Sequence, residues 1–195
     1  MLSDPKFAYN QTRDMANFGS GTLGKPGMRI FGLAGWSGSG KTTLLAALIP
    51  ELVARGLSVS TIKHAHHEFD IDRPGKDSWR HGEAGATEVM VGSARRWALM
   101  HELRGDPEPP LDELIARMSQ VDLVLVEGFK RQPHPKLEIP RPSLGKPLIY
   151  PGDPHVVAIA TDEPFAAPLP LLPLTDAAAI AAFIIDHFGA AAWRS

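Results

Sequence analysis

The stretch FGLAGWSGSGKTTLLAAL, residues 31–48, joins an apolar run to a glycine-rich turn, a lysine, two threonines and an apolar pattern at helical spacing. Its central part, GWSGSGKT (35–42), matches the pattern G-x-x-x-x-G-K-[ST] at every fixed position. Glycines let the backbone turn its N–H groups toward phosphate oxygens, and a following helix adds its free N–H groups and the positive end of its dipole. We therefore interpret this stretch as a phosphate-binding loop between a strand and a helix.

Each residue type in this loop has an expected task. We expect Lys41 to place its ammonium group beside the β- and γ-phosphates, and Thr42 to offer its hydroxyl group to Mg²⁺. The predicted phosphate-binding residues are Gly35, Ser37, Gly38, Ser39, Gly40, Lys41, Thr42 and Thr43. Trp36 packs either across a partner or over the loop itself, and the sequence leaves both alternatives open.

Strand and helix patterns alternate along the rest of the chain. Strands are expected over 28–34, 57–63, 86–92, 121–128, 147–150, 156–162 and 170–174, and 95–103 is expected to pair back on 86–92 as a hairpin. Helices are expected from the loop to Arg55 with a kink at Pro50, from Asp77 as a cap to residue 83, over 111–118, and after Thr175 or Asp176 as a cap. Residues 129–147 are interpreted as a long loop broken by prolines. This alternation predicts an α/β fold, a doubly wound and mostly parallel sheet with helices on both faces.

Size and composition limit the alternatives. With 195 residues and a net charge of −2, the chain fits one domain, 28–195, after a poorly ordered N-terminal extension, 1–27, and has no broad basic footprint for nucleic acid. The absence of cysteine excludes disulfides, thiolate metal sites and a cysteine nucleophile. Neither an apolar run of about 20 residues nor a secretory segment is present, so we expect no membrane span and a cytoplasmic location.

The rule for parallel sheets sorts the acidic candidates. The C-terminal ends of all strands meet at the edge where the loop after the first strand binds phosphate. Glu127 ends the strand 121–128 at this edge, whereas Asp122 begins it about 16 Å away, at about 3.3 Å per residue. We therefore favour Glu127 as a magnesium ligand or a carboxylate that orients water, and Lys41 and Glu127 are the predicted catalytic residues. The alternative for Glu127 is an ordinary carboxylate at a strand end.

The segment KHAHHEFDIDRPGKDS, 63–78, leaves the same edge and carries three histidines and three aspartates. Asp70 is the favoured further ligand of Mg²⁺, and Asp77 is expected to cap a helix. The histidines either bind a transition metal or serve as polar loop residues and phosphate contacts. They are His64, His66 and His67.

Two further groups of polar residues follow later strands. Asp162 ends VVAIATD (156–162), and an aspartate can accept two hydrogen bonds from N1–H and the exocyclic amine of guanine. Thr161 and Asp162 are therefore a candidate reader of guanine, which makes GTP the candidate nucleotide; the alternative is an aspartate in a turn or cap. Three cations after Glu127 either meet a second anionic ligand or belong to a solvated loop. They are Lys130, Arg131 and Lys136.

Three quoted blocks together closely resemble one known family. They are GLAGWSGSGKTTLLAALIPEL (32–52), TIKHAHHEFDIDRPGKDSWRHGEAGA (61–86) and DLVLVEGFKRQPHPKLEI (122–139). The family is MobB, the molybdopterin-guanine dinucleotide biosynthesis adapter proteins, and the resemblance runs from about residue 28 to residue 162. The middle block is much more specific than the phosphate loop, which many unrelated proteins share.

The resemblance implies a P-loop NTPase fold and a homodimer that binds GTP and Mg²⁺ and hydrolyses GTP feebly. It implies that Gly40, Lys41 and Thr42 hold GTP and magnesium, and that Glu127 is the acidic end of the second nucleotide motif. It also implies work beside MobA, the guanylyltransferase that joins GMP to molybdopterin, with the molybdopterin cofactor itself as a further partner.

Two alternative functions stay open at this level. A small-molecule P-loop kinase would carry an arginine-rich lid, and the available arginines are scattered through the sequence. They are Arg80, Arg95, Arg96 and Arg131. A metallochaperone gated by nucleotide is suggested by the histidine cluster and disfavoured by the lack of cysteine.

Overall fold

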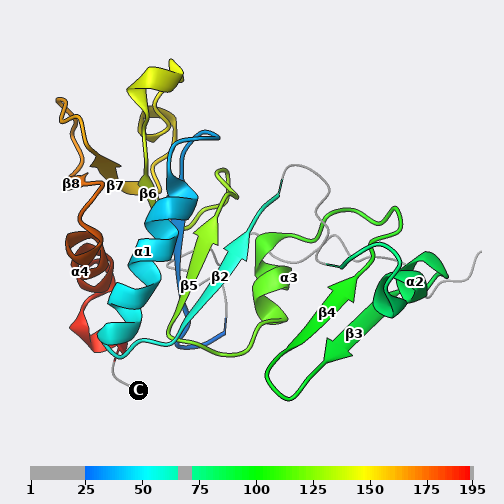
Figure 1. Ribbon diagram of the computed structural model, residues 1–195. Helices are drawn as coiled ribbons and strands as arrows, with labels where there is room; N and C mark the ends of the chain where they lie inside the picture. Colours follow the sequence, from blue (N-terminus) through cyan, green and yellow to red (C-terminus); the bar gives the residue numbers. More distant parts are fainter. Residues whose placement is uncertain (1–24, 66–71, 194–195) are drawn as a thin grey trace, which may run out of the picture.

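The computed structural model describes residues 25–65 and 72–193. Its main body is a six-stranded sheet in the order β2-β5-β1-β6-β7-β8, and every neighbouring pair of strands is parallel (Figure 1). The strands are β1 (Arg29–Ala34), β2 (Val59–Lys63), β5 (Leu123–Glu127), β6 (Lys136–Glu138), β7 (Val156–Thr161) and β8 (Leu171–Pro173). Their C-terminal ends therefore share one edge of the sheet.

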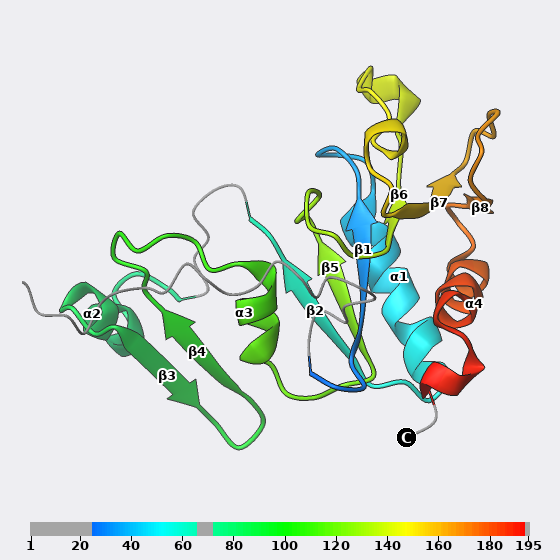
Figure 2. The same cartoon turned by 180° about the vertical axis from the view of Figure 1, so that it is seen from behind.

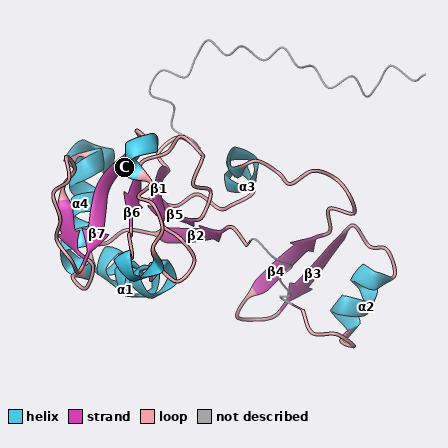
Figure 3. Ribbon diagram, turned by 90° about the horizontal axis from the view of Figure 1, so that it is seen from above, coloured by secondary structure: helices cyan, strands magenta, loops and turns pink. Residues whose placement is uncertain are grey.

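Helices cover both faces of this sheet (Figure 3). α1 (Lys41–Ala54) and α4 (Ala177–Phe188) lie on one face, and the short α3 (Leu111–Ala116) lies on the other. The alternation of side chains along β1 explains the two layers, because Phe31 joins the core under α1 and α4 while Ile30 joins the core under α3. The predicted α/β fold is confirmed.

The predicted hairpin forms, but outside the main sheet. β3 (Glu88–Gly92) pairs antiparallel with β4 (Trp97–His101) as a separate two-stranded sheet. With α2 (Asp77–Glu83), it lies to the side of the main sheet, beyond α3, in both side views (Figures 1 and 2). Its register places the side chains of Met90, Leu99 and Trp97 on one face of the hairpin.

The segment 129–150 differs from the sequence-based expectation. It contains β6, which lies between β1 and β7 in the sheet, whereas the expected strand 147–150 is absent there and gives way to a 3-10 turn, Tyr150–Gly152. The sequence did not predict β6, because two of its three residues are charged and do not form an apolar run. Lys136 and Glu138 are each 1% exposed, and their charged groups are bonded to the protein.

Helix ends and interiors bring smaller corrections. Asp77 is the first residue of α2 and Lys76 occupies the capping position, so the predicted cap at Asp77 was wrong. Asp176 caps α4 by accepting a hydrogen bond from the Ala179 N–H at 2.9 Å, as predicted. α1 continues through Pro50, which is exposed, so that water can bond the carbonyl group left free by the missing N–H.

The predicted N-terminal extension falls mostly on residues outside the described part. Lys25 donates from Nζ to the carbonyl oxygen of Met118 at 2.6 Å, and the Gln120 side chain donates to the Pro26 carbonyl at 3.1 Å. These bonds attach the segment that enters β1 to the end of α3. Among the described helices, none combines the length and the apolar character that crossing a membrane requires.

Candidate functional site

The glycine-rich loop follows β1 directly and ends at the first turn of α1. Gly38 and Gly40 have φ angles of 80° and 100°, which residues other than glycine rarely adopt. Gly35 is required by close packing, since a Cβ atom there would lie 2.5 Å from Ser39 Oγ and 2.7 Å from the Ile139 carbonyl oxygen. The loop therefore depends on the two fixed glycines of the motif, Gly35 and Gly40, and on Gly38 between them.

Lys41 lies within this loop. Its Nζ donates to the carbonyl oxygens of Gly35 at 3.0 Å and Trp36 at 2.9 Å. Burial lowers the pKa of Lys41; Glu127 opposes this shift, while Lys130 and then Lys63 add to it. The Lys41 ammonium group is thus bonded to neutral carbonyl oxygens rather than to a carboxylate. Together with the nearby cations, it makes an environment that favours an anion.

Thr42 and Glu127 meet at the same edge of the sheet. Thr42 Oγ1 donates to Glu127 Oε1 at 2.9 Å, and Lys63 Nζ lies 3.8 Å from the same carboxylate oxygen. Glu127 is 7% exposed although it ends a strand. Asp122, before the start of that strand, instead accepts hydrogen bonds from Ser58, and the Ser58 hydroxyl group is the main cause of its lowered pKa. The two acids thus lie at opposite ends of β5, and only Glu127 lies at the edge that carries the glycine-rich loop.

The donor set at this point suits a hard cation. A hydroxyl oxygen and a carboxylate oxygen within hydrogen-bond distance of each other are ligands that Mg²⁺ prefers. Asp70, the third predicted ligand, lies outside the described residues. Thr43 is exposed in the first turn of α1.

The histidine cluster is only partly described. His66 and His67 lie outside the described residues, and His64 Nε2 is 2.8 Å from Glu108 Oε1, with its ring 4.7 Å from that of Phe129 between centroids. In the described part of the chain, no three histidines, aspartates or glutamates are grouped as metal ligands.

A shallow cavity of about 440 Å³ opens where β7 and β8 end. Its lining residues are Thr161, Asp162, Pro164, Leu171, Leu172, Pro173 and Thr175. The Thr161 hydroxyl group exchanges hydrogen bonds with the backbone of Glu163, both at 3.1 Å, and so holds the turn that presents Asp162. Asp162 is exposed, and within the described residues its carboxylate has no hydrogen bond or ion pair.

The cations after Glu127 have different roles. Lys130 Nζ lies 4.3 Å from the centre of the Trp36 ring, and Trp36 Nε1 donates to the Pro147 carbonyl at 2.8 Å, so Trp36 packs over its own loop region.

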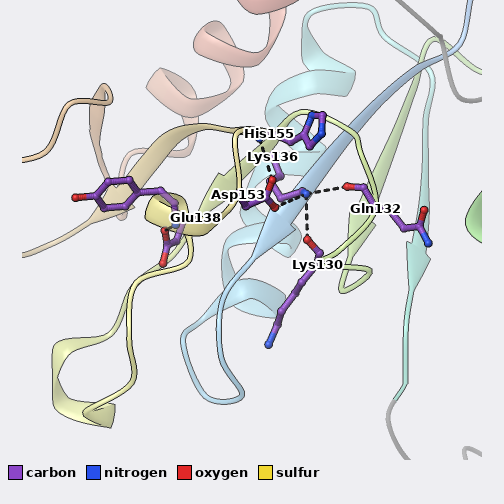
Figure 4. Close-up of polar contacts among 7 residues, drawn as sticks. Lys130, Gln132, Lys136, Glu138, Asp153 and His155 are labelled. Atoms are coloured by element: carbon purple, nitrogen blue, oxygen red, sulfur yellow. Dashed lines mark hydrogen bonds and ion pairs between the residues drawn. The ribbon is translucent and has the colours of Figure 1, made fainter. Parts of the chain in front are cut away.

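Lys136 fits neither predicted alternative. Its buried ammonium group donates to the carbonyl oxygens of Lys130 and Gln132 and to Asp153 at 2.8 Å (Figure 4). It is a structural cation that fixes the turn carrying Lys130.

A second segment at this edge has no role that the sequence predicted. We name residues 139–150 the strap. Glu138 closes its base by accepting hydrogen bonds from the N–H groups of Ile149 at 2.7 Å and Tyr150 at 2.8 Å. The strap carries Arg141, whose only sequence signal is its place between Pro140 and Pro142.

The fold and the site together define a class of protein. An all-parallel sheet, a glycine-rich loop between β1 and α1, and a strand-end carboxylate bonded to the loop threonine are the features of a P-loop NTPase. The chain belongs to one family of this class: residues 30–162 match the family described as Molybdopterin guanine dinucleotide synthesis protein B (MobB).

Named relatives agree with this family. The Molybdopterin-guanine dinucleotide biosynthesis adapter protein of Escherichia coli is 43% identical over 84% of this chain and 95% of its own length. The protein of the same name from Haemophilus influenzae is 46% identical over 82% and 90%.

Solved structures agree as well. A crystal structure of molybdopterin-guanine biosynthesis protein B is similar with a TM-score of 0.64 and 27% identity, over 80% of this chain and 97% of that one. The crystal structure of Bacillus subtilis MobB is similar with a TM-score of 0.62 and 26% identity, over 80% and 96%.

Proposed function

We propose that this chain is a GTP-binding adapter protein of molybdopterin-guanine dinucleotide biosynthesis that works in the cytoplasm. The relatives from E. coli and H. influenzae carry the name of such an adapter and align over most of their length. The nucleotide part rests on one observation, the hydrogen bond from Thr42 to Glu127. It brings the loop hydroxyl and the strand-end carboxylate to one point beside the Lys41 loop.

In this proposal the loop holds the triphosphate of GTP together with Mg²⁺. Backbone N–H groups at the start of α1 bind phosphate oxygens, and the Lys41 ammonium group exchanges its two loop carbonyls for them. Thr42 and Glu127 would hold Mg²⁺, with Asp70 as a further proposed ligand, and the ion would neutralise part of the phosphate charge.

The base would occupy the cavity at the ends of β7 and β8. Asp162 presents a carboxylate without a partner among the described residues, and it lines a cavity large enough for part of a nucleoside. A carboxylate there accepts from the N1–H and amino groups of guanine, whereas adenine offers no such donor pair. The proposal therefore favours GTP over ATP.

Hydrolysis would be weak. Water attacks the γ-phosphorus, the bond to the β–γ bridging oxygen breaks, and GDP and phosphate leave, with Lys41 stabilising the charge. We expect the isolated protein to hydrolyse GTP at less than about 1 per second, as GTPases do when a partner protein must supply a missing catalytic group.

A titration with GTP and with ATP tests this proposal. The wild-type protein should bind GTP with Mg²⁺ more tightly than ATP, Lys41→Ala should lose both, and Asp162→Ala should lose only the preference for GTP. Undiminished binding by Lys41→Ala would contradict the phosphate site. Equal affinity of the wild-type protein for GTP and ATP would contradict the guanine site alone.

The adapter role requires partners. We propose a MobA-like guanylyltransferase and the molybdopterin cofactor as partners, and a homodimer as the working form. The hairpin supports the homodimer, because Met90, Leu99 and Trp97 on one of its faces are 64%, 43% and 64% exposed. An apolar face of this kind on a narrow two-stranded sheet is typical of an interaction surface.

A further inference from the structure

The strap, residues 139–150, runs alongside the glycine-rich loop. Both side views place it, in yellow, beside the blue glycine-rich loop at the same end of the molecule (Figures 1 and 2). Its first residue, Ile139, donates its N–H to the Ala34 carbonyl at 2.8 Å, just before the loop begins. Near its end, the Pro147 carbonyl accepts from Trp36 Nε1 at 2.8 Å. The strap is therefore attached to the loop region at two points, and by Glu138 at its base.

Arg141 lies between these attachments. A Cβ atom built on Gly40 would lie 3.6 Å from Arg141 Nη2, so the guanidinium group lies beside the N-cap residue of α1. The Leu144 N–H donates to the Arg141 carbonyl at 2.9 Å, and prolines on both sides restrict the backbone. The backbone that carries Arg141 is thus constrained where the strap passes the glycine-rich loop.

Nothing in the described part of the chain neutralises this guanidinium group. No carboxylate within the described residues forms an ion pair with it, whereas Arg55 and Arg117 pair with neighbouring glutamates. It adds to a group of cations at the loop that includes Lys41, Lys63 and Lys130. A planar guanidinium group is well suited to bidentate hydrogen bonds with phosphate oxygens.

We propose that Arg141 binds the phosphate chain of the nucleotide held by this loop, as a positioning residue supplied by the same chain. This inference rests on the proposed function, since it adds a residue to that phosphate site. The strap delivers the guanidinium group from the β6 side of the loop, while Lys63 ends β2 and Lys130 follows β5 on the other side. The bound phosphates are then flanked by cations on both sides.

The experiment measures binding of GTP and of inorganic tripolyphosphate, each with Mg²⁺, by isothermal titration. Arg141→Ala and Arg141→Gln should each weaken both ligands by about ten- to a hundred-fold, the range expected for a charge-assisted bond. Arg141→Lys should recover part of the loss by keeping the charge. The matched control is Arg117→Ala, which removes an exposed arginine at the C-cap of α3, and this variant should bind as the wild-type protein does.

The outcomes separate the two proposals. Unchanged binding of both ligands by Arg141→Ala and Arg141→Gln, with the loss on Lys41→Ala retained, would overturn this inference and leave the proposed function standing. Loss of GTP binding with unchanged tripolyphosphate binding would also overturn it, because Arg141 would then act on the base or ribose. A wild-type protein that binds neither ligand would contradict the proposed function itself.

Discussion

Among the charged side chains near the sheet edge, some lie at the glycine-rich loop and others form bonds that hold the fold together. Glu127 and Asp122 belong to the same short segment, yet one meets the phosphate loop and the other bonds Ser58 at the far end. Lys130 and Lys136 show the same division, since one lies over Trp36 and the other is buried. Residue type alone does not predict these roles; the position of each residue relative to the ends of the parallel strands does.

The first prediction concerns Glu127. Glu127→Gln should weaken binding of GTP in the presence of Mg²⁺ by about tenfold or more, because a neutral amide is a poorer ligand for a hard cation. Binding with the metal chelated should change little. The matched control is Asp122→Asn, which removes a carboxylate from the opposite end and should leave the affinity for GTP as it is. Equal effects of the two variants would contradict the assignment.

The second prediction concerns His134, a buried side chain whose ring nitrogens lack partners among the described residues. Burial, with help from Lys136, lowers its pKa from 6.5 to about 4. The unfolded chain takes up a proton near pH 6.5 and the folded chain does not, so stability is complete above pH 6.5 and falls as pH drops toward 4. The free energy of unfolding should decrease by about 2 kcal/mol between pH 7 and pH 5 from this group.

Urea denaturation of His134→Leu at both pH values isolates this contribution. The variant should show a smaller decrease than the wild-type protein. His187, whose pKa is also lowered by burial, contributes in the same direction to both proteins and cancels in the comparison. Identical decreases in the two proteins would show that His134 is not the group responsible.

At the scale of elements, sequence patterns were sufficient wherever an element is apolar. The strands β1, β5 and β7 and the helix α4 were predicted because mostly apolar runs mark them, with charges only near the ends, such as Arg29 in β1 and Glu127 in β5. β6 was not, because its three residues, KLE, include two charges that only the folded environment satisfies. The loop motif was predicted in full, whereas Arg141 was not, since its place beside Gly40 depends on where β6 lies in the sheet.

The third prediction tests how β6 is held. Lys136→Met leaves the Asp153 carboxylate without its ion-pair partner and two carbonyls without the lysine donor, and should cost about 3–5 kcal/mol of unfolding free energy. The double variant Lys136→Met/Asp153→Asn should cost less than the sum of the two single changes. Lys76→Met, an exposed lysine, should change stability by less than about 0.5 kcal/mol. Strict additivity in urea denaturation would contradict a coupled buried pair.

The whole molecule combines a six-stranded sheet with a small unit formed by α2, β3 and β4 at its side. The sequence predicted the hairpin, because two strand-like runs flank Gly92 and Ser93. It did not predict that the hairpin stays out of the main sheet, because strand order depends on contacts between distant segments. The exposed apolar face of the hairpin is a property of this arrangement.

The fourth prediction tests the proposed homodimer. The wild-type protein should sediment as a dimer at micromolar concentration, and Trp97→Ser/Leu99→Ser should sediment as a monomer, because each change removes exposed apolar surface from the hairpin. Val53→Ser alters an equally exposed apolar residue on α1 and should leave the dimer intact. A monomeric wild-type protein would contradict the homodimer, and a dimeric double variant would contradict this interface.

The position of Trp36 has an optical consequence. Its indole ring belongs to the glycine-rich turn, touches the Lys130 ammonium group and bonds Pro147 of the strap. The other three tryptophans lie in α2, in β4 and near the C-terminal end of the described chain. Any anion that displaces Lys130 from the ring will change the emission of this one fluorophore, so the protein carries an intrinsic reporter of occupancy that Trp36→Phe would silence.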